Sequence, residues 1–364
     1  MYSLSIELRF MCHILKVMSQ VKHWRRNSPM LRVAAIVLLA ASCSFAQSGR
    51  PVSQAGDETS ENETIRIRTE EILVPVSIRD SSGAFVSGLS PDRFLIFDNG
   101  ERQEIASLNR ERIPANIVLL LDASGSVFNR MRFIREAAKR FLKSLLPEDK
   151  VCVMQFADNA ELLQDWTAGT NSKPLLKALE WRYHPGQATV FYDGLYLAAQ
   201  EQLSHVEGRR IVILLTDGID SAEHKRASFS DALYAIRRSE ASVYVISLTE
   251  SLRADIVRSD RGWVGRVFGG SDPRAVARAN TILDEAERLL TTVATETGGR
   301  IFFPIKEEDL LPAYESIADE LRSQYILTFK PKKRAAAGEY RRIKVLVTPG
   351  GYEVAARDGY VGRS

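Results

Sequence analysis

The stretch NIVLLLDASGS, residues 116–126, decides the fold. It opens with a continuous apolar run, which is typical of a strand buried on both faces of a parallel sheet. The run ends in the polar loop Asp122-Ala123-Ser124-Gly125-Ser126. Apolar residues then recur at spacings of one, three and four, as on one face of a helix: Phe133, Ile134, Ala137, Phe141, Leu142 and Leu145. The stretch therefore predicts a buried strand, a polar loop and a helix.

Similar units continue through residues 113–322. Further apolar strands are predicted at KVCVMQF (150–156), RRIVILLTDG (209–218), SVYVISL (242–248) and RIFFPI (300–305). Helices are predicted at VFYDGLYLAAQEQL (190–203), ALYAIRRSE (232–240) and ILDEAERLLTTVATET (282–297). Apolar strands that alternate with helices indicate a mostly parallel sheet covered on both faces. The predicted fold class is thus α/β, with a doubly wound, Rossmann-like domain.

The segments that flank this region, 65–112 and 323–364, show the two-residue alternation of half-buried strands. Asp98-Asn99-Gly100 predicts a hairpin turn in the first segment. Each segment alone is too short for a stable sheet. We therefore expect the two segments to pack together as a small β unit.

The first 46 residues have the features of a secretory signal peptide. Basic Arg25, Arg26 and Arg32 flank an apolar stretch that ends at Ser44-x-Ala46, and we predict cleavage after Ala46. Met30 is the preferred start, because it gives the leader a short basic segment. An uncleaved anchor and a lipidated Cys43 are the alternatives, and each would provide the chain's contact with a membrane. Residues 47–64 are polar and predict a flexible linker.

The charge distribution argues against nucleic-acid binding. The net charge is +3, and the first 46 residues carry +5, so residues 47–364 sum to −2. The predicted location is secreted, periplasmic or associated with the cell envelope. Cys152 is the one cysteine after the leader, and its apolar strand predicts a buried small side chain rather than a nucleophile.

Polar side chains gather where the predicted strands end. Asp122, Ser124 and Ser126 follow the first strand, Asp217 follows a later one, and Thr189 precedes a helix. Ligands of open α/β sheets bind at the carboxyl ends of the strands. Two carboxylates and three hydroxyls are oxygen donors, which suit Mg²⁺, with Mn²⁺ and Ca²⁺ as alternatives. Other polar residues are predicted in roles outside the metal shell: Asp193 and Asp220 as helix-end or loop charges, Asp158 as a turn residue, and His184, His205 and His224 in loop or surface positions.

These five residues resemble the metal-ion-dependent adhesion site of the von Willebrand factor type A domain. The family pattern is D-x-S-x-S after the first strand, then a distant Thr, then an Asp at a later strand end. The resemblance covers roughly residues 115–320 and implies a Rossmann-like fold and Mg²⁺ binding at these positions. Gln187-Ala188 departs from the Gly-Gly that often precedes the Thr. The flanking segments resemble those of secreted bacterial proteins of this kind, known especially from acidobacteria.

The resemblance implies a protein-binding module, not an enzyme, whose Mg²⁺ accepts an Asp or Glu carboxylate from a protein partner. We expect the stretch 251–275 to flank the metal site. Its candidate contact residues are Arg261, Trp263, Val264, Arg266 and Phe268; alternatively, Trp263 and Phe268 hold this stretch against the domain. Two other functions stay open: a metal-assisted phosphoryl hydrolase, for which the sequence offers no evident general base, and a metal-independent structural protein of the envelope.

Overall fold

The structure is a computed structural model that describes residues 71–109, 113–257 and 273–363. The chain divides into two units, Met1–Arg66 and Ile67–Ser364, and the described residues belong to the second. The predicted signal peptide with Met30 and Cys43, the predicted linker and the candidate contact residues 261–268 lie outside the described residues.

The strands are β1 (Ile72–Arg79), β2 (Phe94–Asp98), β3 (Glu101–Gln103), β4 (Ile105–Asn109), β5 (Ala115–Asp122), β6 (Lys150–Phe156), β7 (Ala160–Ala168), β8 (Arg209–Thr216), β9 (Ser242–Ser247), β10 (Ile301–Phe302), β11 (Tyr325–Phe329), β12 (Tyr340–Val347), β13 (Glu353–Ala356) and β14 (Gly359–Val361). The α-helices are α3 (Met131–Lys143), α4 (Lys173–Trp181), α5 (Phe191–Leu197), α6 (Phe229–Ser239), α7 (Thr249–Val257), α9 (Pro273–Glu296) and α10 (Leu310–Ser323). Short 3₁₀ or π segments are η2 (Pro91–Arg93), η3 (Gly125–Arg130), η4 (Gly169–Asn171), η5 (Ala198–Gln202), η6 (Leu203–His205) and η7 (Glu307–Asp309).

The central sheet of the described chain has the strand order β10-β9-β8-β5-β6-β7. All neighbours are parallel except β6 and β7, which form an antiparallel pair at one edge. Strand β5 lies between β8 and β6 and pairs with both along nearly its whole length. The predicted doubly wound α/β fold is confirmed.

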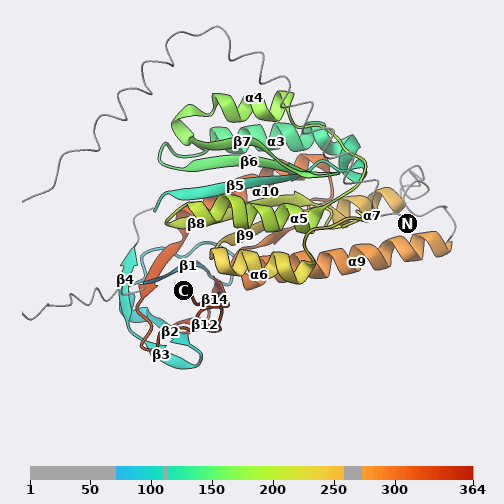
Figure 1. The fold of residues 1–364 in the computed structure, drawn as a ribbon. Helices are drawn as coiled ribbons and strands as arrows, with labels where there is room; N and C mark the ends of the chain where they lie inside the picture. The colour runs from blue at the N-terminus through green and yellow to red at the C-terminus, as the bar shows by residue number, and fades with distance from the viewer. Residues whose placement is uncertain (1–70, 110–112, 258–272, 364) are drawn as a thin grey trace, which may run out of the picture. The chain divides into compact units, whose positions relative to one another are not determined.

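Strand β5 is buried on both faces because it separates two hydrophobic cores. Ile117, Leu119 and Leu121 enter one core together with residues of α3, α4 and α10. Val118 and Leu120 enter the other core, which is closed by α5, α6 and α9 (Figure 1). The continuous apolar run in the sequence thus has a direct cause, since alternate side chains of one strand fill opposite cores.

The flanking segments form two four-stranded antiparallel sheets, with the orders β13-β1-β11-β4 and β14-β12-β2-β3. Each sheet combines strands from the N-terminal and C-terminal segments; β1 pairs with β11, and β2 pairs with β12. Apolar residues of both sheets form one shared core, which includes Val74, Ile96, Leu327 and Val345. The predicted small β unit is confirmed, and so is the hairpin at Asn99-Gly100, which joins β2 to β3.

A buried polar network joins this β unit to the α/β domain. Glu320 of α10 is 1% exposed and accepts hydrogen bonds from Ser77 and Arg79 of β1, at 2.8 and 3.0 Å. Gln324, at the end of α10, donates to Ser77 and to the hydroxyl of Tyr244 in β9. Helix α10 therefore connects the two sheet systems through side chains as well as through the backbone that continues into β11.

The stretch 251–275, which we expected to flank the metal site, begins and ends in helices. Its first residues belong to α7, where Ser251 and Leu252 are buried, and its last residues begin α9. Leu252 packs with Leu283 of α9 in a small separate cluster. The stretch is therefore helical at both described ends.

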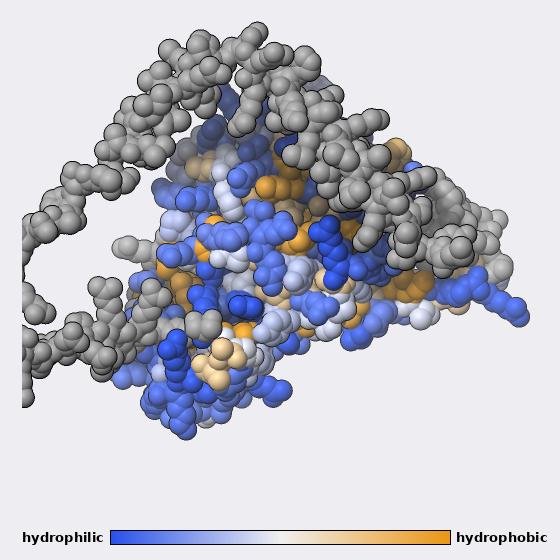
Figure 2. Space-filling model, in the orientation of Figure 1, coloured by the Kyte–Doolittle hydropathy of each residue, from blue (hydrophilic) through white to orange (hydrophobic). Residues whose placement is uncertain are grey.

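The face of the molecule drawn in Figure 2 is mostly hydrophilic over the described residues, and hydrophobic side chains occur there in separate small patches. Among the helices of the described ranges, none combines the length and the apolar character that a bilayer span requires.

A buried ion pair stabilises the β unit and gives a test of its contribution. Asp98 is fully buried and accepts bonds from Nε of Arg341 at 2.9 and 3.1 Å and from the Tyr360 hydroxyl at 3.1 Å. We predict that Asp98→Ala lowers the free energy of unfolding by about 3–5 kcal/mol, because it removes the buried partner of Arg341 and leaves only the more exposed Glu339, at 3.4 Å. Urea unfolding followed by circular dichroism measures the change.

The matched control is Lys333→Ala, which removes an exposed ion pair to Glu101 at 3.7 Å. Exposed pairs contribute about 1 kcal/mol or less. Equal losses in the two variants would contradict the role given to the buried pair.

Candidate metal centre

The two predicted aspartates lie at the same edge of the central sheet. Asp122 is the last residue of β5, and Asp217 directly follows β8. These strands are adjacent and parallel, with Leu121 opposite Leu215, so both chains leave the sheet at the same level. The carboxylates meet there because parallel neighbours place their carboxyl ends together.

Hydrogen bonds connect four of the five predicted residues in one continuous cluster. The backbone N–H of Ser124 donates to Oδ1 of Asp122 at 2.8 Å, and the Oγ atoms of Ser124 and Ser126 lie 3.0 Å apart. Ser126 Oγ donates in turn to Oδ2 of Asp217. The D-x-S-x-S loop thus turns alternate side chains toward one point.

Thr189 lies on a neighbouring loop. This loop is fixed to the first by a bond from the Gly186 N–H to the Ala123 carbonyl at 2.8 Å. Thr189 is buried, and its own N–H donates to Ser221 Oγ at 3.1 Å. Within the described residues, no hydrogen bond joins Thr189 to the other four predicted residues.

Asp158, predicted as a turn residue, organises the loop before Thr189. Its Oδ1 accepts the backbone N–H groups of Gln187 and Ala188 at 3.0 and 2.7 Å. A Cβ at Gly186 would lie 2.7 Å from Oδ2 of Asp158, so this close approach requires glycine. The loop in which Gln187-Ala188 replaces Gly-Gly is therefore held in place by Asp158.

Two residues that the sequence analysis did not select support Asp122. Thr216 Oγ1 donates to Oδ2 of Asp122 at 2.7 Å and accepts the Gly218 N–H at 2.9 Å. The Tyr183 hydroxyl donates to the backbone carbonyl of Asp122. Thr216 could have been selected from its place in the T-D-G strand end, whereas nothing near Tyr183 in the sequence signals its contact.

A third residue, Arg130, connects the segment after the Asp122–Ser126 loop to α7. Its Nε donates to Ser251 Oγ at 2.9 Å, and its guanidinium pairs with Asp255. Its positive charge also acts to lower the pKa of Asp217. No sequence signal distinguished this arginine from the other basic residues of the neighbouring helix.

Two buried acids, Asp122 and Asp217, lie close together in the cluster. Both aspartates are fully buried. Burial, followed by repulsion from Asp217, raises the pKa of Asp122 from 3.8 to about 7, and burial raises the pKa of Asp217. A divalent cation would offset this cost, and the carboxylate and hydroxyl oxygens are the donors that hard cations prefer. The residues therefore fit a Mg²⁺-type site.

The predicted ligands are two carboxylates and three hydroxyls, whereas other metal sites use three or more carboxylates, or histidine and cysteine. In the described part of the chain, no group of three or more His, Cys, Asp or Glu side chains could hold a metal. Cys152 is buried as predicted, and burial raises the pKa of its thiol, which disfavours the reactive thiolate.

An exposed aromatic side chain follows the cluster directly. Phe128 lies two residues after Ser126 in η3, and 59% of its surface is exposed. The sequence analysis placed aromatic contacts only in 261–268, which lie outside the described residues. Phe128 is therefore an exposed apolar candidate for partner contact next to the cluster, and the sequence analysis did not select it.

Comparison with known proteins identifies the domain. The family profile of the von Willebrand factor type A domain matches residues 116–260. No curated protein matches the sequence. The chain is similar in fold to proximal thread matrix protein 1 from the mussel byssus, with 17% identity, a TM-score of 0.42, and coverage of 60% of this chain and 49% of the mussel protein. It thus spans about half the length of that protein.

Two other solved structures are similar. The PilB minor pilin from Streptococcus sanguinis has 14% identity and a TM-score of 0.40, with 58% of this chain and 62% of the pilin covered. A von Willebrand factor type A protein from Catenulispora acidiphila has 12% identity and a TM-score of 0.40, with coverage of 82% of this chain and 76% of the other. By the profile match, residues 116–260 are a von Willebrand factor type A domain.

Proposed function

We propose that this chain is an exported, non-enzymatic protein-binding module that captures a partner carboxylate at a Mg²⁺ site after β5. The observation that carries the proposal is the hydrogen-bonded cluster of Asp122, Ser124, Ser126 and Asp217, in which two buried acids lie together. Asp122, Ser124, Ser126, Thr189 and Asp217 would hold the ion. When bound, the ion would supply a positive centre for an Asp or Glu of the partner.

The chain's own residues would shape this site. Thr216 holds one oxygen of Asp122, and the backbone of Ser124 holds the other. Such partners orient a ligating carboxylate, and their loss typically lowers metal affinity about 10- to 100-fold. Phe128 and the segment with Arg261, Trp263, Val264, Arg266 and Phe268 would add contacts to the partner protein, since exposed aromatic and arginine side chains often anchor interfaces.

Export and a place in the cell envelope belong to the same proposal. They are supported by the basic and apolar leader in residues 1–46, with Ala46 as the cleavage position and Cys43 as an alternative lipid anchor. The flanking β unit supports membership of the secreted bacterial group that the sequence resembles.

We predict that Mg²⁺ or Mn²⁺ raises the melting temperature of the wild-type chain, because an ion that binds only the folded state stabilises it. At about 100 times the dissociation constant, the gain is about 2.7 kcal/mol. The double variant Ser124→Ala/Ser126→Ala should lose this gain. Thermal unfolding with and without the metal measures both.

The matched control is Ser144→Ala/Ser204→Ala. It also removes two hydroxyls, each of which donates to a backbone carbonyl at a helix end outside the cluster. It should keep the full metal-dependent gain. A wild-type melting temperature that no divalent metal changes would overturn the proposed site.

We also predict that stabilisation by Mg²⁺ increases as the pH rises through about 7, the raised pKa of Asp122. In the metal-free chain, the folded state keeps a proton on Asp122 that the unfolded state releases above its ordinary pKa of 3.8. The metal-free stability therefore falls as the pH rises between these two values. The ion requires the ionised carboxylate, so it competes with this proton.

The measurement is the difference in melting temperature with and without Mg²⁺ on either side of pH 7. Asp122→Asn, which has no titrating group at this position, should show neither the metal-dependent gain nor its pH dependence. A gain that stays constant from acidic to alkaline pH would contradict the assignment of Asp122 as a ligand.

Partner capture tests the function itself. The immobilised wild-type chain should retain an envelope protein in Mg²⁺ and release it on chelation, because the partner's carboxylate binds through the ion. Ser124→Ala/Ser126→Ala should not retain it, and Phe128→Ala should weaken retention while leaving the metal-dependent melting shift intact. Retention unchanged by chelation would favour a metal-independent structural role, and phosphate-ester turnover that Asp122→Ala abolishes would favour a hydrolase.

A further inference from the structure

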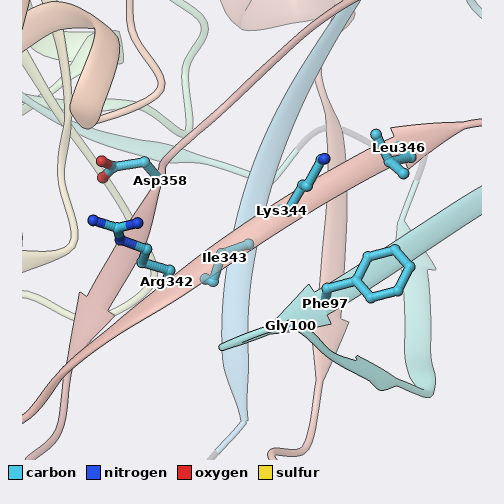
Figure 3. Close-up of a pocket in the computed structure, with 7 residues that line it drawn as sticks. All are labelled: Phe97, Gly100, Arg342, Ile343, Lys344, Leu346 and Asp358. Atoms are coloured by element: carbon cyan, nitrogen blue, oxygen red, sulfur yellow. The ribbon is translucent and has the colours of Figure 1, made fainter.

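The outer face of the sheet β14-β12-β2-β3 contains a hollow of about 630 Å³, drawn in Figure 3. Strand β12 alternates strictly: Ile343, Val345 and Val347 enter the core of the β unit, while Lys344 and Leu346 point outward. Outward side chains of β12 and β2 line most of the hollow, and the core residue Ile343 and the turn residue Gly100 complete its lining. The hollow therefore opens on the side of the sheet opposite the core.

The floor of the hollow is apolar. Phe97 and Leu346 line it from β2 and β12 (Figure 3), and the register places Leu95 opposite Leu346. Leu346 is 38% exposed, and Phe97 is half-buried. Water thus contacts large apolar side chains that an incoming apolar group could cover.

The surroundings of this floor are basic. Arg342 and Lys344 lie along β12, and Arg102 of β3 stands opposite Phe97. All three are exposed, and none of them makes an ion pair with another described residue. Asp358, the acid that lines the hollow, accepts a hydrogen bond from the Tyr340 hydroxyl. Arg342, Lys344 and Arg102 thus outnumber the one lining acid, and the hollow has an excess of positive charge.

One end of the same sheet face is already covered. Helix α6 packs against β14, and the Arg237 guanidinium carbon lies 4.8 Å from the centre of the Tyr340 ring. The Tyr340 ring in turn occupies the space beside Gly359, where a Cβ would lie 2.4 Å from it. The face is therefore packed at the α6 end and open at the end that contains Phe97 and Leu346.

We propose that this hollow, defined by Phe97, Arg342, Lys344 and Leu346, is a second binding site that takes an acidic protein segment carrying a large apolar side chain. The apolar group fills the hollow over Phe97 and Leu346, and carboxylates of the segment pair with Arg342 and Lys344. The charge complementarity selects an acidic partner. A concave apolar floor receives a side chain, whereas insertion into a lipid surface requires apolar groups that protrude.

This site is separate from the metal centre in sequence and in chemistry. Its residues come from β2, β12 and the turn after β13, and it uses positive charge where the cluster at β5 uses negative charge. Binding here therefore requires no divalent ion, which makes the two sites experimentally distinguishable.

The test uses the full chain and a fluorescent twelve-residue peptide of Asp and Glu with a central Leu-Phe pair, followed by fluorescence anisotropy in the presence of chelator. We expect saturable binding to the wild type. Arg342→Glu/Lys344→Glu should weaken binding about tenfold or more, because it replaces attraction by repulsion. Leu346→Ser should weaken it about fivefold by removing apolar contact.

Two controls make the result specific. Lys177→Glu, a reversal at an exposed position of α4, should bind like the wild type. A peptide with Ser-Ser in place of Leu-Phe should bind much more weakly, and each variant should keep the wild-type melting temperature within about 2 °C.

The proposal is overturned if the wild type does not bind the Leu-Phe peptide, if the Ser-Ser peptide binds equally, or if the double reversal has no effect. A parallel experiment tests membrane binding by sedimenting the chain with vesicles of phosphatidylglycerol and phosphatidylcholine. Sedimentation with these vesicles that is lost in the double reversal, without peptide binding, would assign the surface to a membrane instead.

Discussion

The structure depends on the burial of β5 between two hydrophobic cores. Alternate side chains of this strand face α3, α4 and α10 on one side and α5, α6 and α9 on the other. Because β8 and β6 saturate its backbone hydrogen bonds, β5 has a fixed register and a fixed end. The polar loop must then begin at Asp122, directly beside the end of β8. Packing along the whole of β5 thereby sets the position of the Asp122 carboxylate in the candidate metal centre.

That constraint has an electrostatic cost. Two buried carboxylates meet at one sheet edge, and the chain partly compensates them with hydroxyl and amide donors: Thr216, Ser126 and the N–H groups of Ser124 and Ile219. Arg130 adds a positive charge nearby, although its guanidinium is engaged with α7. Perturbed pKa values of this kind are concentrated at functional sites, where burial and neighbouring charges are arranged to produce them. Hydrogen bonds thus organise the cluster, while its two buried carboxylates keep raised pKa values.

The β unit depends on contacts between segments that are far apart in the sequence. Its strands come from opposite ends of the described chain, so its core forms only when segments more than 200 residues apart meet, as in the pairing of Val74 with Leu327. Such non-local pairing carries a high entropic cost before any contact is gained. Glu320, Ser77 and Gln324 couple this unit to α10, and α10 belongs to the core that also contains β5. The α/β domain therefore provides the surface on which the terminal segments assemble.

The sequence by itself determined the class of fold and four residues of one hydrogen-bonded cluster, because apolar periodicity marks each strand and helix and polar side chains mark the strand ends. It also indicated that the two flanking segments associate, since each is too short to form a stable sheet alone. Asp122, Ser124 and Ser126 are neighbours in the chain, and Asp217 is marked by its strand end. Only the tertiary structure decided that Thr189 is held by Ser221, that Asp158 anchors the preceding loop, and that Tyr183 and Arg130 surround the aspartates. The hollow over Phe97 and Leu346 was likewise beyond sequence reasoning, since its floor joins strands some 250 residues apart. Contacts between distant segments follow from packing, which no local pattern encodes.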